Sequence, residues 1–140
     1  MSVMRGFAAA TAVVSFVGLA SGAQAATEIQ WWHAMGGALG ERVADIAKGF
    51  NESQSDYKVV PTYKGNYTEN MTAGIAAFRS GKQPHILQVF EVGTATMMSA
   101  KGAIKPVHEL MAEAGEPFDP ASYLSTVAGY YTTPDGQMLS

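Results

Sequence analysis

The sequence predicts an α/β fold with a doubly wound, mostly parallel sheet. Two observations support this prediction. Short runs of β-branched and aromatic residues alternate with longer stretches whose apolar residues recur at helical spacing. The resulting order of strand, helix, strand, helix, strand, helix is typical of parallel sheets covered by helices on both faces. Ligands of such sheets bind beyond the carboxyl ends of the strands.

The first 25 residues predict a signal peptide that is removed before the chain folds. Arg5 precedes an apolar stretch over residues 7–20, and small residues end at Ala23-Gln24-Ala25. This is the pattern of an export signal with an A-x-A cleavage site, and the apolar stretch is short for a membrane-spanning helix. A retained anchor is the alternative. We expect cleavage after Ala25 and an exported, soluble chain.

Composition indicates which classes of partner the chain can bind and what stabilises its fold. The 140 residues carry a net charge of −3 and no cysteine. The charges are dispersed without a basic run, which argues against nucleic acid and anionic membranes as partners. Without disulfides, an exported domain of this size depends on packing for its stability.

The first strand is expected at residues 28–33 and the second at residues 57–63, where Pro61 indicates an edge strand or a bend. Between them lies an amphipathic helix with a single apolar stripe. The residues of that stripe are Leu39, Val43, Ile46, Ala47 and Phe50.

The next helix has the clearest start and stop signals. Asn66 can cap it, and Glu69 is placed to complete a capping box. One face is lined by Tyr67, Met71, Ile75 and Phe78, and the stop signals are Arg79, Gly81 and Pro84.

The remaining elements are a third strand at residues 85–90, a helix at residues 94–101 and a shorter helix at residues 107–114. The tail, residues 129–140, contains a Pro-Asp-Gly turn and predicts a hairpin.

Glu91 is the first candidate site residue, because it follows the third strand and precedes a helix. Its carboxylate can interact with the exposed amides of that helix N-terminus, or it can accept hydrogen bonds from a pair of ligand hydroxyls. Position alone leaves both roles open. Tyr67 is similarly either part of its helix's apolar face or a hydroxyl directed at the same cleft.

Trp32 and His33 end the first strand and are candidates for lining the cleft. Alternation along a strand turns Trp31 and Trp32 to opposite faces, so core packing is the alternative for either ring. His33 can also orient the loop of residues 34–37 by hydrogen bonding.

Catalysis has little support in the sequence. The three histidines lack metal-binding spacing, no nucleophile elbow or P-loop is present, and no second carboxylate accompanies Glu91. We therefore expect no enzyme, no metal and no cofactor, with an exported hydrolase as the alternative.

Three stretches resemble the family 1 extracellular solute-binding proteins of bacterial ABC uptake systems. They are residues 32–40 (WHAMGGALG), 59–81 (VVPTYKGNYTENMTAGIAAFRSG) and 86–107 (ILQVFEVGTATMMSAKGAIKPV). The resemblance implies a periplasmic-binding-protein-like lobe of a two-lobed clamp that closes on its ligand. It also implies that residues 26–140 are the N-terminal part of lobe one, truncated before the second lobe.

The resemblance further implies that Tyr67 and Glu91 bind sn-glycerol-3-phosphate. A carboxylate suits the glycerol hydroxyls and repels the phosphate, whose contacts in the family lie beyond Ser140. The expected protein is a monomeric periplasmic receptor that delivers its ligand to membrane permease subunits. Another polyol, a sugar or a glycerophosphodiester is the alternative ligand. We expect the isolated chain to have little affinity, because half a cleft leaves the ligand hydrated.

Overall fold

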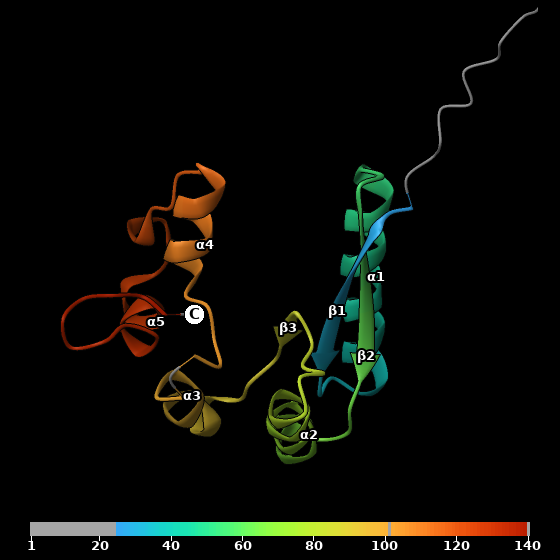
Figure 1. Ribbon diagram of the computed structural model, residues 1–140, viewed down its shortest axis with the longest axis horizontal. Coiled ribbons are helices and arrows are strands. Elements are labelled where there is room, and N and C mark those ends of the chain that lie inside the picture. Colours follow the sequence, from blue (N-terminus) through green and yellow to red (C-terminus); the bar gives the residue numbers. More distant parts are fainter. Residues whose placement is uncertain (1–24, 101, 140) are drawn as a thin grey trace, which may run out of the picture.

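The computed structural model describes residues 25–100 and 102–139, and the predicted signal peptide falls almost wholly outside this part of the chain. Three parallel strands form one sheet in the order β2-β1-β3 (Figure 1). These strands are β1 (Thr27–His33), β2 (Tyr57–Tyr63) and β3 (Ile86–Leu87). No helix in the described part is long and apolar enough to cross a membrane. The α/β prediction is confirmed.

The register of the strands separates the two faces of the sheet. His33 pairs with Tyr63, and both line a hollow against the first helix. Trp32 pairs with Leu87 on the opposite face, where Leu87 lies against Gly74 of the second helix. Residues in register share a face, so the two helices cover opposite faces and the sheet is doubly wound as predicted.

Helix α1 (Gly37–Ser53) packs against β2 with only part of its predicted apolar stripe. Val43 and Ala47 are buried, whereas Leu39, Ile46 and Phe50 are exposed. Only part of the predicted apolar stripe is therefore buried against the described residues.

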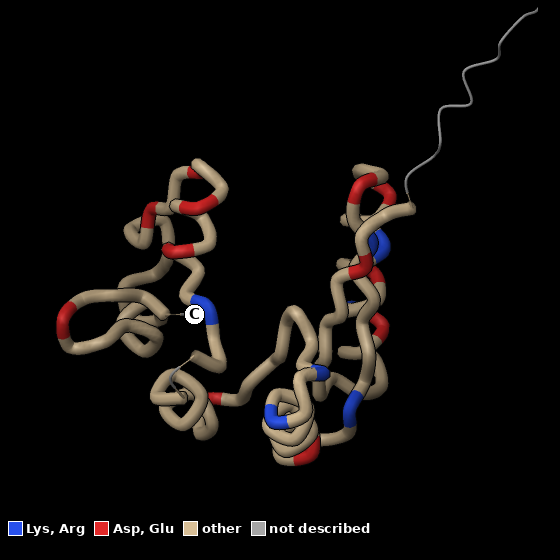
Figure 2. Tube along the Cα trace, viewed as in Figure 1, with Lys and Arg blue, Asp and Glu red and all other residues tan. Residues whose placement is uncertain are grey.

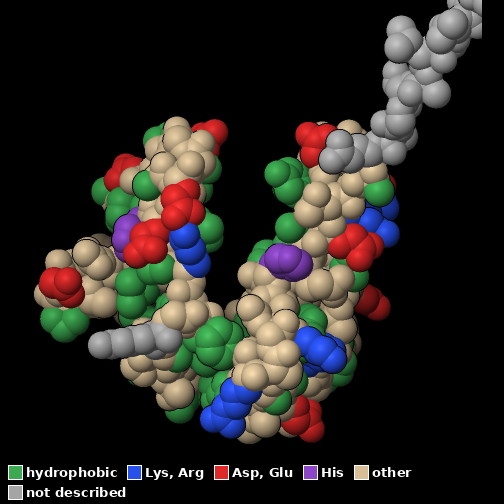
Figure 3. Space-filling view, in the orientation of Figure 1, with side chains coloured by type: hydrophobic (Ala, Val, Ile, Leu, Met, Phe, Trp, Pro, Cys, Tyr) green, Lys and Arg blue, Asp and Glu red, His purple; other side chains and the backbone are tan. Residues whose placement is uncertain are grey.

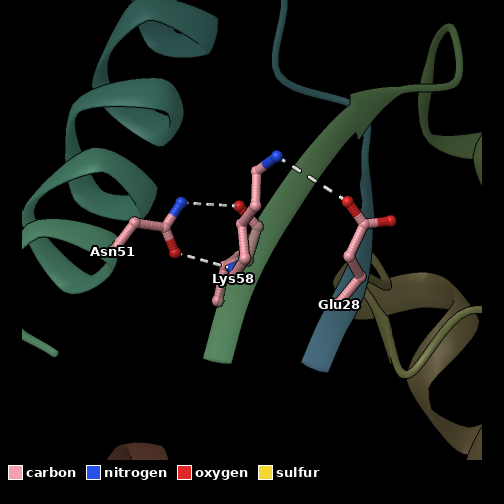
Figure 4. Close-up of polar contacts among 4 residues, drawn as sticks. Glu28, Asn51 and Lys58 are labelled. Atoms are coloured by element: carbon pink, nitrogen blue, oxygen red, sulfur yellow. Dashed lines mark hydrogen bonds and ion pairs between the residues drawn. The ribbon is translucent and has the colours of Figure 1, made fainter. Parts of the chain in front are cut away.

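Asn51 fastens the end of α1 to the sheet. Its side-chain amide donates to the Val59 carbonyl (2.9 Å) and accepts from the Val59 N–H (2.7 Å), so both of its polar atoms are paired (Figure 4). On the other side of β2, Lys58 forms an exposed ion pair with Glu28 of β1 (3.7 Å). Exposed ion pairs contribute about 0–1 kcal/mol, so the paired Asn51–Val59 hydrogen bonds contribute more to stability than the Lys58–Glu28 ion pair.

Helix α2 (Tyr67–Arg79) begins with the predicted capping box. The Glu69 N–H donates to the Asn66 side chain (3.0 Å), and the Asn66 N–H donates to the Glu69 carboxylate (2.7 Å). After the helix, Gly81 adopts a φ of +67°, a conformation that L side chains rarely adopt. Both predicted helix signals are confirmed.

Helix α2 approaches the third strand closely because Gly74 has no side chain. A Cβ placed at Gly74 would lie 2.5 Å from the Leu87 side chain. This contact presses α2 onto the Trp32 face of the sheet near the carboxyl ends of β1 and β3.

The third strand and the following helix differ from their predicted bounds. The strand covers Ile86–Leu87, although the His85 and Gln88 N–H groups also donate to β1 carbonyls. The chain then bends, and α3 (Glu91–Met98) begins three residues earlier than predicted; Lys101, the predicted end, lies outside the described residues.

The last part of the chain forms short helices. Helix α4 (Val107–Ala114) has its predicted bounds, and a turn of residues 133–136 closes an antiparallel bridge between Thr132 and Met138, as the hairpin prediction expects. The 3₁₀ helix η1 (Pro120–Ser122) and α5 (Ser125–Tyr130) were not predicted, because such short elements show no apolar periodicity.

The sheet part and the α4–α5 part enclose an open hollow, visible in the space-filling view (Figure 3). A cavity of about 830 Å³ lies between α2, β3, α3 and residues 103–110, with a mostly apolar lining. Asp and Glu residues occur on both parts of the molecule, whereas most Lys and Arg residues lie on the sheet part (Figure 2).

Candidate functional site

The strand order places a switch point between β1 and β3. The chain leaves β1 toward β2 on one side, whereas β3 lies on the other side of β1. In open α/β sheets, ligands bind beyond the carboxyl ends of the strands at such a point. Here those ends lead to the loop after His33 and to Glu91. The Glu91 position that the sequence analysis selected therefore lies beyond the carboxyl end of β3, beside this switch point.

Glu91 is the first residue of α3, and its side chain is exposed. The helix has no side-chain cap hydrogen bond, so the carboxylate contributes only the favourable interaction of an acid with a helix N-terminus, about 0.3–1 kcal/mol. The Glu91 carbonyl accepts a hydrogen bond from the Tyr130 hydroxyl of α5. The backbone at Glu91 is thus anchored while its carboxylate stays open to solvent, an arrangement suited to accepting donors from a ligand.

Tyr67, the first residue of α2, lies beside the segment that leads to Glu91. Its ring stacks on Phe90, with centroids 5.4 Å apart and planes at 20°. The side chain remains about two-fifths exposed. The Tyr67 ring therefore packs on Phe90 while part of the residue stays accessible to solvent.

Trp32 lies on the α2 face of the sheet, as the alternation along β1 predicts. The Lys64 ammonium is 4.0 Å from the centroid of its indole ring. Such a contact contributes about 0.5–1 kcal/mol at exposed sites and holds the cation at the carboxyl end of β2.

His33 lies on the opposite face and is buried, with 5% of its surface exposed. The Met35 N–H donates to His33 Nδ1 (3.3 Å), so the predicted hydrogen bond to the following loop is present. Burial lowers the pKa of His33 below its ordinary value, which keeps the imidazole neutral at pH 7. The ring borders a shallow hollow of about 480 Å³ together with Tyr63 and Gly36.

The structure thus brings Tyr67 close to the start of α3, because its ring stacks on Phe90, the residue before Glu91. Trp32 and His33 lie on opposite faces of the sheet. Neither of the two hollows is lined by Tyr67 or Glu91. Within residues 25–100 and 102–139, no group of three or more His, Asp or Glu side chains is placed to hold a metal ion.

Two residues of this region were missed by the sequence analysis. Asn70 is completely buried and donates from Nδ2 to the Gln88 carbonyl (2.7 Å). The Gln88 side chain accepts from the Ala34 N–H (2.9 Å). The sequence signal that could have identified Asn70 was its place among the apolar residues of α2, since a buried asparagine requires a hydrogen-bond partner.

Comparison with curated proteins finds close relatives of one kind. The chain is 56% identical to the sn-glycerol-3-phosphate-binding periplasmic protein UgpB of Rhizobium meliloti over 123 residues, 88% of the chain. It is 54% identical to the protein of the same name from Agrobacterium fabrum over 95% of the chain, and 59% identical to that from Yersinia pestis over 84%. The chain is homologous to these binding proteins.

The glycerol-3-phosphate-binding relatives are much longer than this chain. It spans 29% of the Rhizobium protein, 30% of the Agrobacterium protein and 27% of the Yersinia protein. No protein-family model matches the chain. The Rhizobium and Agrobacterium relatives are named as periplasmic binding proteins.

Proposed function

We propose that this chain supplies part of one lobe of a solute-binding receptor that captures sn-glycerol-3-phosphate for an ABC transporter. The observation that carries the proposal is the identity of more than 50% to proteins named for this ligand, over most of the chain. The exposed Glu91 carboxylate and the partly exposed Tyr67 support it, because both lie where a parallel sheet presents its ligand site.

In this proposal, Glu91 accepts hydrogen bonds from the glycerol hydroxyls. An ionised carboxylate offers two oxygens to neighbouring hydroxyls and repels a phosphate group. Tyr67 binds the same end of the ligand, and Trp32 and His33 line the cleft. The phosphate is bound by residues outside this chain, in the remainder of a two-lobed clamp. The receptor performs no catalysis and contains no cofactor.

The proposed receptor works in the periplasm as a monomer. Its signal peptide is cleaved after Ala25, and residues 26–140 form the N-terminal part of lobe one. The closed receptor passes its ligand to the membrane permease subunits. The relatives' names support the location, and their greater length supports a larger receptor.

A chimera tests the ligand. Residues 26–140 replace the matching segment of the Rhizobium meliloti protein, and calorimetry measures the affinity for sn-glycerol-3-phosphate, with glycerol, inorganic phosphate and maltose as comparisons. We expect the chimera to bind sn-glycerol-3-phosphate most tightly. A folded chimera that prefers maltose, or that binds none of the four, would contradict the proposal.

Glu91→Gln tests the role of the carboxylate in that chimera. Losing a charge-assisted hydrogen bond costs about 1–3 kcal/mol, which is roughly 5- to 150-fold in affinity. Glu109→Gln is the matched control, because Glu109 is also an exposed acid in the first turn of a helix without a side-chain cap. Equal affinities in both variants would reduce Glu91 to a helix-terminal charge.

A further inference from the structure

Three hydrogen bonds of Gln88 connect the segments at the switch point of the sheet. Asn70 of α2 donates from Nδ2 to the Gln88 carbonyl (2.7 Å). The Gln88 side chain accepts from the Ala34 N–H (2.9 Å), and the Gln88 N–H donates to the Trp32 carbonyl (2.9 Å). Gln88 therefore binds the carboxyl end of β1 through two groups, while its carbonyl is held by α2.

Each segment joined by these bonds carries a candidate ligand residue. Tyr67 lies one helical turn before Asn70, Glu91 lies three residues after Gln88, and His33 immediately precedes Ala34. A displacement of Gln88 would therefore move Glu91 relative to both Tyr67 and the loop after β1.

The hydrogen bonding of Asn70 is unlike that of a purely structural asparagine. Asn51 pairs both of its polar atoms with the backbone of Val59. Asn70 is 0% exposed, yet its Oδ1 has no hydrogen-bond partner among the described residues. A buried acceptor without a partner lowers stability, so stability alone is a poor reason for an amide at this position.

We propose that Asn70 and Gln88 are positioning residues that set the separation between Glu91, Tyr67 and the loop after His33. The proposal rests on the proposed function, because it concerns the geometry of that ligand site. Neither residue has to touch the ligand. Their effect on affinity acts through Glu91, which lies three residues after Gln88.

The test uses the chimera with Asn70→Leu and, separately, Gln88→Met, which replace the polar groups by apolar groups of similar size. We expect each variant to lower the affinity for sn-glycerol-3-phosphate about 10-fold. In a Glu91→Gln background, the same substitutions should lower it less than about 3-fold, because residues that act through one group are not additive. Asn51→Leu is the matched control and should lower the unfolding temperature without changing affinity.

Four outcomes separate the possibilities. Unchanged affinity in Asn70→Leu and Gln88→Met, with only the unfolding temperature lowered as in Asn51→Leu, overturns the positioning role. Full additivity with Glu91→Gln also overturns it. If Asn70→Leu does not fold, Gln88→Met decides alone. A Glu91→Gln variant with unchanged affinity contradicts the proposed ligand site itself, which distinguishes that failure from failure of the positioning role.

Discussion

The Tyr67 ring stacks on the Phe90 ring, with centroids 5.4 Å apart and planes 20° from parallel. This contact connects the first turn of α2 with the N-cap residue of α3, immediately before Glu91. Two candidate ligand residues that are 24 positions apart in sequence are thus held by one aromatic pair. Such a pair contributes about 0.5–1.5 kcal/mol beyond the area it buries.

Tyr67→Phe and Tyr67→Leu should separate the contribution of the Tyr67 hydroxyl to ligand binding from the contribution of its ring to packing. In the chimera, we expect Tyr67→Phe to lower sn-glycerol-3-phosphate affinity about 3- to 10-fold, the value of one hydrogen bond, without changing the unfolding temperature. Tyr67→Leu should lower both, because the stacking on Phe90 is lost as well. Tyr123→Phe, in the separate Phe118–Tyr123 pair, is the control with unchanged affinity. A Tyr67→Phe affinity equal to that of the unmodified chimera would assign Tyr67 to packing alone.

Gly93→Ala should disturb the same region through its bulk. A Cβ at Gly93 would lie 2.7 Å from Met71 Sδ and 3.0 Å from Phe90 Cε1, so the Phe90 ring has to shift. Overpacking of this kind costs about 1–3 kcal/mol. Gly49→Ala in α1 meets no atom within 4 Å and should stabilise the protein by about 0.5–1 kcal/mol. Chemical denaturation measures both, and a Gly93→Ala variant as stable as the Gly49→Ala variant would contradict the close packing.

His33 should make stability depend on pH. Burial lowers its pKa in the folded state from the ordinary value of 6.5, so the unfolded chain binds the additional proton. The contribution of neutral His33 to the free energy of unfolding is complete above pH 6.5. It is lost as the pH falls below 6.5 toward the folded-state pKa of His33. His33→Gln, whose side-chain oxygen can still accept from Met35, should flatten the change in unfolding free energy between pH 7 and pH 5. Equal slopes for the two proteins would show that His33 does not titrate on unfolding.

The isolated polypeptide of residues 26–140 should bind sn-glycerol-3-phosphate more weakly than about 1 mM, because one half of a cleft leaves the phosphate unpaired and the ligand hydrated. Calorimetry of this polypeptide beside the chimera measures the difference. Micromolar binding by the isolated polypeptide would mean that the residues beyond the carboxyl ends of β1 and β3 are sufficient for ligand recognition.

Local signals in the sequence predicted several elements with their correct bounds. Asn66 and Glu69 specified the start of α2, because a capping box requires only residues three positions apart. Helix α4 was predicted from the stop signals Gly115 and Pro117, and Gly115 adopts the left-handed conformation at its end. Pro61 predicted an edge strand or a bend, because proline cannot donate to a neighbouring strand, and β2 is an edge strand of the described sheet.

Other features depended on partners that are distant in sequence. The apolar residues Leu39, Ile46 and Phe50 have the same periodicity as Val43 and Ala47, yet they are exposed while Val43 and Ala47 are buried. The third strand pairs with β1 at Trp31 and Trp32. Periodicity specifies neither which residues of a stripe are buried nor how far a strand pairs.

The sequence by itself determined the order of strands and helices and the cap of α2, since these depend on neighbouring residues. The general rule for strand ends left the roles of Glu91 and Tyr67 open, and the family resemblance alone implied that both bind ligand. The tertiary structure alone decided that Phe90 joins Tyr67 to the segment of Glu91 and that Asn70 and Gln88 connect three segments at the switch point. These contacts join residues 18 to 54 positions apart. Such pairings arise only when the sheet and α2 pack together, because a side chain's local sequence does not specify which distant backbone group it will meet.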